Sequence, residues 1–170
     1  MDSDEMHQLR AVFKFLQTLE LNDALPESFV QDLLDINALF TLEQISILGS
    51  AGDHELILLT LLKGSSNLRK FSVNAEQACL TDRTLEALAM YCPRLQDLKI
   101  SCRTMQFKDS VMAQLFSSCR SLRCIIFQGD LGPSTFKLMS LHCKQLRKLD
   151  LFCSSITDAN VLTVVKGCPL

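Results

Sequence analysis

One short pattern of apolar and polar positions returns six times along the chain. It has the form L-x-x-L-x-L, in which other apolar residues can replace leucine. Apolar residues at the fourth and sixth positions fall on the same side of an extended segment, so each copy predicts a short β-strand. Successive copies begin 24 to 27 residues apart. Their first residues are Leu16, Leu42, Leu68, Leu95, Leu122 and Leu146.

A second pattern lies between the strand motifs and predicts helices of about three turns. In four units, apolar residues stand 3, 6 and 10 positions after an Asp or a Pro, which keeps them near one face of a helix. These helices are expected to start at Asp82, Asp109, Pro133 and Asp158. An Asp at this place can accept hydrogen bonds from the first N–H groups of its own helix, and Pro suits the first turn. Two less regular helices are expected at about residues 25–37 and 53–63.

The alternation of strand and helix requires neighbouring strands to run parallel. A period of about 20 to 29 residues with this motif is typical of leucine-rich repeats. The predicted fold is therefore an α/β solenoid of about six repeats over residues 16–170, with a curved parallel sheet on its concave side and helices on its convex side. Residues 1–15 are expected to form an N-terminal capping helix. The last residue, Leu170, falls where a seventh strand would begin. We therefore expect a solenoid that is truncated at its C-terminus. The chain would then be a fragment, a shortened isoform, or a chain whose end is covered by a partner.

The composition adds a question about cysteine. The chain has 170 residues, 48% of them hydrophobic, which excludes a disordered chain and suffices for one core. It also has eight cysteines and no sequence pattern of a signal peptide, so we expect a reducing compartment, the cytoplasm or the nucleus, and free thiols. Half of the cysteines share one register, at the end of a predicted helix and three residues before the next repeat motif. They are Cys92, Cys119, Cys143 and Cys168.

This register predicts small buried side chains at a tight corner. Two further cysteines, Cys102 and Cys153, are expected in the turns that leave the sheet. The chain has no C-x-x-C pair, and cysteines about 25 residues apart in a solenoid form a column instead of a tetrahedral cage. We therefore expect no metal and no cofactor.

Three stretches resemble the cysteine-containing subclass of leucine-rich repeats, which is best known from F-box/leucine-rich-repeat proteins. They are Tyr91-Cys92-Pro93-Arg94-Leu95, the segment 143–158, and Gly167-Cys168-Pro169-Leu170. In that family the concave face of the solenoid recruits a substrate, and a separate F-box binds a Skp-type adaptor and a cullin. The resemblance thus implies substrate recognition for a ubiquitin ligase, with that adaptor and cullin as partners if an F-box is present outside this chain. No F-box is seen in the sequence, so a free-standing leucine-rich-repeat adaptor or inhibitor is the alternative.

The third, fifth and seventh positions of each motif are expected to face outward from the sheet, in three columns. The surface expected to bind a partner protein combines charged, polar and apolar members of these columns. It comprises Lys70, Asp97, Lys99, Ile126, Gln128, Lys148, Asp150 and Phe152. On neighbouring strands, Ile126 and Phe152 predict an exposed apolar spot, unless Phe152 tucks into the loop and Ile126 is a lone exposed residue.

Charge is divided unevenly along the chain. Residues 1–60 hold eleven acidic and two basic residues, and residues 61–170 hold eight acidic and fifteen basic ones. This division could steer a partner of opposite polarity, although a solvated helix face on each half is the favoured explanation. The basic pairs Arg69-Lys70 and Arg147-Lys148 lack interleaved aromatic residues, so no nucleic acid is expected, and no apolar run is long enough for a membrane.

Catalysis has little support in the sequence. The three histidines, His7, His54 and His142, occur outside the known nucleophile, zinc and phosphate-binding motifs. We therefore expect a non-catalytic protein-interaction module and no enzyme.

Overall fold

The computed structural model describes residues 15–21, 38–48, 55–74, 80–153 and 156–168. In these ranges one sheet contains six parallel strands, whose spatial order is their order in the sequence. The strands are β1 (Thr18–Leu21), β2 (Gln44–Leu48), β3 (Lys70–Asn74), β4 (Asp97–Gln106), β5 (Cys124–Asp130) and β6 (Lys148–Phe152). Each begins two residues after the start of its sequence motif, so the six predicted strands are confirmed.

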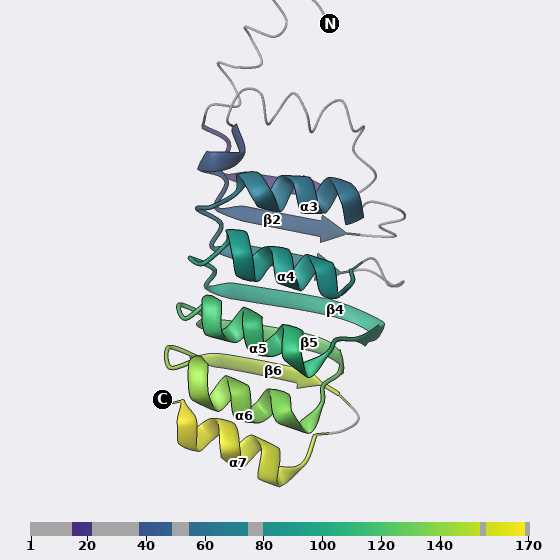
Figure 1. The fold of residues 1–170 in the computed structure, drawn as a ribbon, viewed down its shortest axis with the longest axis vertical. Coiled ribbons are helices and arrows are strands. Elements are labelled where there is room, and N and C mark those ends of the chain that lie inside the picture. The colour runs from purple at the N-terminus through teal and green to yellow at the C-terminus, as the bar shows by residue number, and fades with distance from the viewer. Residues whose placement is uncertain (1–14, 22–37, 49–54, 75–79, 154–155, 169–170) are drawn as a thin grey trace, which may run out of the picture.

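Helices alternate with the strands and lie together on one side of the sheet (Figure 1). The described residues form a 3₁₀ helix, η1 (Ala38–Thr41), and five α-helices of ten residues each. The α-helices are α3 (Glu55–Gly64), α4 (Asp82–Tyr91), α5 (Asp109–Ser118), α6 (Pro133–His142) and α7 (Asp158–Gly167). The predicted α/β class is confirmed, and the arrangement is compatible with a repeat solenoid. The capping helix expected at residues 1–15 and the helix expected at 25–37 lie outside the described residues.

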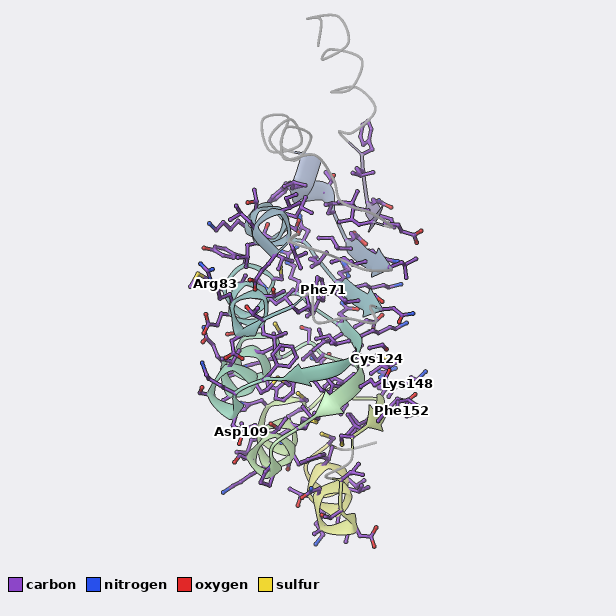
Figure 2. The ribbon with its side chains drawn as sticks, turned by 90° about the vertical axis from the view of Figure 1, so that its right-hand side faces the viewer. Phe71, Arg83, Asp109, Cys124, Lys148 and Phe152 are labelled. Carbon is purple, nitrogen blue, oxygen red and sulfur yellow. The ribbon has the colours of Figure 1, made fainter. Side chains whose placement is uncertain are left out.

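The core fills the space between the sheet and the helices. Side chains at the fourth and sixth motif positions point inward, and in the central strands Leu98, Ile100, Ile125 and Phe127 are fully buried. Figure 2 places Phe71 of β3 between the strand and helix layers. Towards the last strand the burial decreases, because the equivalent leucines of β6, at positions 149 and 151, are only partly buried.

The residues that cap the helix starts differ from the expectation. The caps of α4 and α7 are Thr81 and Thr157, whose hydroxyl oxygens accept hydrogen bonds from the backbone N–H groups of Arg83 (3.1 Å) and Asn160 (3.3 Å). The acidic residue that follows is thus the first residue of the helix. In α4, Asp82 accepts a hydrogen bond from the backbone N–H of Lys108, one unit further on (3.2 Å).

Other acidic residues at helix starts also join neighbouring units. The carboxylate of Asp109 in α5 accepts a hydrogen bond from the hydroxyl of Thr135 in α6 (2.8 Å), and Thr135 is fully buried. In α3, Glu55 accepts from the hydroxyls of Thr81 and Thr84 at the start of α4. In these pairs the earlier unit provides the carboxylate and the later unit the donor, so the acids hold successive helix starts together.

Four cysteines end four helices, as their register predicts. Cys92, Cys119, Cys143 and Cys168 are buried and are the C-cap residues of α4 to α7. The thiol of Cys92 donates to the carbonyl of Ser65 (3.5 Å), and that of Cys119 donates to the carbonyl of Cys92 (3.4 Å). The carbonyls of Ser65 and Cys92 also accept hydrogen bonds from the backbone N–H groups of Leu68 and Leu95, so each thiol is a second donor to a carbonyl at the end of the preceding unit.

The prediction for Cys102 is wrong. This residue lies within β4, which continues to Gln106, whereas a turn had been expected after the strand motif. The extension exists because β4 pairs with β5 a second time, at Gln106 and Asp130, after an irregular stretch. Within that stretch of β5, Gly129 has φ 150°, a conformation that side-chain-bearing residues rarely adopt. Cys153 follows β6 directly, as predicted, and Cys79 lies outside the described residues.

Candidate partner-binding surface

Strand pairing arranges the outward residues of the sheet in three columns, and we call this side of the sheet the sheet face. The first column runs through Thr18, Gln44, Lys70, Asp97, Cys124 and Lys148. The second column runs through Glu20, Ser46, Ser72, Lys99, Ile126 and Asp150. The third column runs through Leu48, Asn74, Ser101, Gln128 and Phe152. In Figure 2, Cys124, Lys148 and Phe152 lie on the strand side and Asp109 and Arg83 on the helix side.

The structure brings all eight predicted surface residues onto four adjacent strands, β3 to β6. The exposed members of the set are Lys70, Lys99, Lys148 and Phe152. The half-buried members are Asp97, Ile126, Gln128 and Asp150. Opposite charges lie next to each other at Lys70 and Asp97, which are register partners. The arrangement is a continuous surface of mixed character, and its role in binding stays a prediction.

The two apolar residues of this surface are diagonal neighbours. Phe152 pairs with Gln128, whereas Ile126 pairs with Asp150. Residues on adjacent strands that are offset by two positions along the strand have Cα atoms about 8 Å apart. Since Phe152 is 64% exposed, its ring does not tuck into the loop. A single apolar side chain of a partner could contact both residues.

Sequence reasoning missed a pair of exposed arginines at the edge of the sheet where β5 and β6 begin. Arg123 and Arg147 stand at the second position of their motifs, just before β5 and β6, and both are exposed. Their backbones are joined directly, because the N–H of Arg147 donates to the carbonyl of Arg123 (2.8 Å). They share their motif position with Glu43 and Arg69, which form an ion pair (3.6 Å). Because this position precedes the strand, alternation along the strand does not predict the direction of its side chain.

A free thiol lies among the charged groups of the sheet face. Burial raises the pKa of Cys124, and the carboxylate of Asp97 raises it further, while Lys99 and Lys148 lower it. The net effect is a rise, so the thiol stays protonated at neutral pH. A nucleophilic cysteine needs the opposite shift.

The buried thiols are less acidic still. Burial raises the pKa of Cys92, Cys119 and Cys143 to about 12, and it also raises the pKa of Cys168. Six cysteines have free thiols: Cys92, Cys119, Cys124, Cys143, Cys153 and Cys168. The four buried thiols therefore have the character of core side chains.

We expect thiol labelling to separate the cysteines by their position. With N-ethylmaleimide near neutral pH, Cys124 should react well before Cys92, Cys119 and Cys143. A thiol with a pKa of about 12 in place of 9 holds roughly a thousandfold less thiolate, and burial restricts access further. Mass spectrometry of the labelled peptides over time measures the rates, with the denatured chain as control. Labelling of a buried cysteine as fast as Cys124 would contradict the assignment.

Within the described ranges, no three histidine, cysteine, aspartate or glutamate side chains are grouped so that they could hold a metal ion. The helices of the same ranges are too short or too polar to cross a membrane. His142 is half-buried at the end of α6, and the other two histidines lie outside these ranges.

Comparison with known proteins gives one informative similarity. No model of a known protein family matches the chain. The chain is similar to F-box/LRR-repeat protein 4 of Bos taurus, with 25% identity over 131 residues. The aligned part covers 58% of this chain and 21% of that protein, so the chain spans about a fifth of the length of this curated relative. The similarity supports a leucine-rich-repeat-like character for the chain.

Proposed function

We propose that this chain is a non-catalytic protein-recognition module of the leucine-rich-repeat class, and that it captures substrates for a Skp/cullin/F-box-type ubiquitin ligase. The similarity to an F-box/LRR-repeat protein is the observation that carries the proposal. The regular stack of strands and helices supports it, since repeats of this kind present a broad surface for partners.

The sheet face is the proposed recognition surface. Its side chains come from separate repeats and vary from strand to strand, while the inward positions are uniformly apolar. Fold alone does not define a function, so the argument depends on this surface. An exposed phenylalanine such as Phe152 is a common anchor for a partner protein.

The proposal includes the absence of catalysis and a reducing compartment. The thiol of Cys124, which is accessible on the sheet face, has a raised pKa, and this argues against an activated nucleophile. Free buried thiols that donate hydrogen bonds to carbonyls suit the cytoplasm or the nucleus.

A second candidate is a free-standing adaptor or inhibitor that uses the same surface without a ligase. The sheet face itself supports this candidate, because the 64% exposed Phe152 could anchor a partner without any ligase component.

Affinity capture of the endogenously tagged protein, in the full length that cells express and under reducing conditions, distinguishes the two candidates. We expect a Skp-type adaptor and a cullin among the captured proteins, identified by mass spectrometry. Capture of other proteins through the sheet face, with adaptor and cullin absent, would refute the ligase role and favour the free-standing adaptor.

A variant tests the sheet face in the same experiment. Ile126→Ser combined with Phe152→Ser should reduce the captured partner at least tenfold, because the exposed apolar pair is lost. Met90→Ser is the matched control, since Met90 is also 64% exposed but lies on α4, on the opposite side of the sheet. Undiminished capture by the double variant would exclude the Ile126–Phe152 pair as an anchor.

A further inference from the structure

Four cations on the last three strands form no ion pair with any of the residues that the structure describes. Lys99 on β4, Arg123 before β5, and Arg147 and Lys148 at the start of β6 are all exposed. In the described part of the chain the ion pairs are Arg69–Glu43 and Lys108–Asp82, and neither includes a member of this group. We call these four residues the basic group.

The arginine pair is the most informative part of the basic group. The same two register positions hold an arginine and a glutamate in the second and third repeats, where the side chains approach to 3.6 Å. In the fifth and sixth repeats both positions hold arginine, and the backbones are hydrogen-bonded to each other (2.8 Å). Two neighbouring guanidinium groups repel each other, and a carboxylate between them would replace the missing glutamate.

Two aspartates moderate the charge without cancelling it. Asp97 and Asp150 are half-buried on the same strands, so the surface keeps a net charge of two positive units across the four cations and two anions. Acidic groups within the surface disfavour a phosphate backbone, which presents a continuous row of negative charges. They do not disfavour a peptide, whose carboxylates can be placed singly against the arginines.

Phe152 lies at the other end of β6 from the cations. The strand runs from Lys148 to Phe152, and four residues at about 3.3 Å each separate their Cα atoms by about 13 Å. An extended peptide covers the same distance in four residues. Ile126 lies one strand away, in register with Lys99 and Asp150, so the cationic end opposite Phe152 is formed by Arg147 and Lys148 together with Arg123, and Lys99 lies beside the apolar pair.

We propose that this part of the sheet face, formed by β4 to β6, binds an extended acidic segment of a partner protein that carries a large apolar side chain three to four residues from its acidic residues. The inference depends on the proposed protein-recognition function and adds the chemistry of the partner. Carboxylates meet Arg123 and Arg147, and the apolar side chain meets Phe152 and Ile126.

Selection from a phage-displayed library of random 12-residue peptides tests the proposal. The intact chain should enrich peptides with two or more Asp or Glu and with Phe, Leu or Trp three to four positions away. A synthetic peptide of the enriched class should bind about tenfold more weakly to the variant Arg123→Glu with Arg147→Glu. The variant Phe152→Ser should retain the acidic preference and lose the apolar one.

Matched controls locate the effect on the surface. Arg83→Glu with Lys137→Glu reverses two exposed charges on the helices and should leave peptide binding unchanged. A 12-nucleotide single-stranded DNA provides the competing macromolecule. Absence of acidic enrichment, binding that survives reversal of the arginine pair, or DNA binding tighter than peptide binding would each overturn the proposal.

Its failure can be distinguished from failure of the proposed function. If the library selection gives no acidic class, but cellular capture still depends on Ile126 and Phe152, the recognition role stands and the assigned partner chemistry is wrong. If neither experiment depends on the sheet face, both proposals are wrong.

Discussion

Replacing Phe127 with alanine is expected to lower the free energy of unfolding by about 3 to 5 kcal/mol, the largest effect of any change considered for this chain. Phe127 is fully buried on β5, where its register partners are Ile100 and Leu151. Its ring packs edge-to-face against Phe107, with centroids 5.9 Å apart and an interplanar angle of 64°. The substitution removes this contact and leaves a cavity at the centre of the stack.

Urea denaturation followed by circular dichroism measures the change. Phe152→Ala is the matched control, because it removes the same ring from a 64% exposed position and should cost at most about 0.5 kcal/mol. If Phe127→Ala and Phe152→Ala had equal effects, the assignment of the inward and outward sides of the strands would be wrong.

Gly167→Ala is expected to destabilise the chain by about 1 to 3 kcal/mol, although alanine is the better helix former. Gly167 is the last residue of α7, and a Cβ atom there would stand 2.5 Å from the carbonyl oxygen of Ser140 in α6. The backbone carbonyl cannot rotate away as a side chain could, so the two helices have to separate. The gain in helix propensity, at most about 1 kcal/mol, does not offset this cost.

Thermal and urea unfolding of Gly167→Ala measure the effect, with Lys166→Ala as the control at the preceding exposed position. Lys166→Ala should remain within about 0.5 kcal/mol of the parent chain. A stabilised Gly167→Ala variant would mean that α6 and α7 do not approach as closely as described.

Much of the fold could be predicted because its period is explicit in the sequence. A motif repeated every 24 to 27 residues fixes the strand starts, and the Asp or Pro residues fix the starts of α4 to α7. Side chains alternate along a strand, so equal spacing between motifs also determines which residues share a column. The columns that contain Lys70, Lys99 and Phe152 follow from this regularity.

The departures come from contacts that the period does not encode. A carboxylate at a helix start can accept a hydrogen bond from its own helix or from the next unit, and the sequence does not distinguish the two arrangements. Asp82 and Asp109 accept hydrogen bonds from the next unit. The placement of Cys102 in β4 depends on the second pairing with β5 near Gly129, which interrupts the regular register. Local pattern has no information about such a long-range irregularity.

The sequence predicted which strand residues of the candidate surface point outward, but it did not predict how these residues are arranged. Alternation identified Ile126 and Phe152 as outward residues, but their diagonal placement and the 64% exposure of Phe152 depend on how β5 and β6 align. Arg123 and Arg147 were not predicted as part of it, because they precede the strands, where alternation gives no direction. Their adjacency follows from the hydrogen bond between their backbones.

The decrease in burial from β5 to β6 has a dynamic consequence. Leu149 and Leu151 are only partly buried, whereas Ile125 and Phe127 are fully buried. The amide protons of β6 and α7 should therefore exchange with solvent through openings of lower free energy than those of β4 and β5. Phe152 belongs to this more easily opened strand. A partner that binds Phe152 would therefore also stabilise β6 against opening. Partner binding would then slow amide exchange in residues well beyond those that contact the partner.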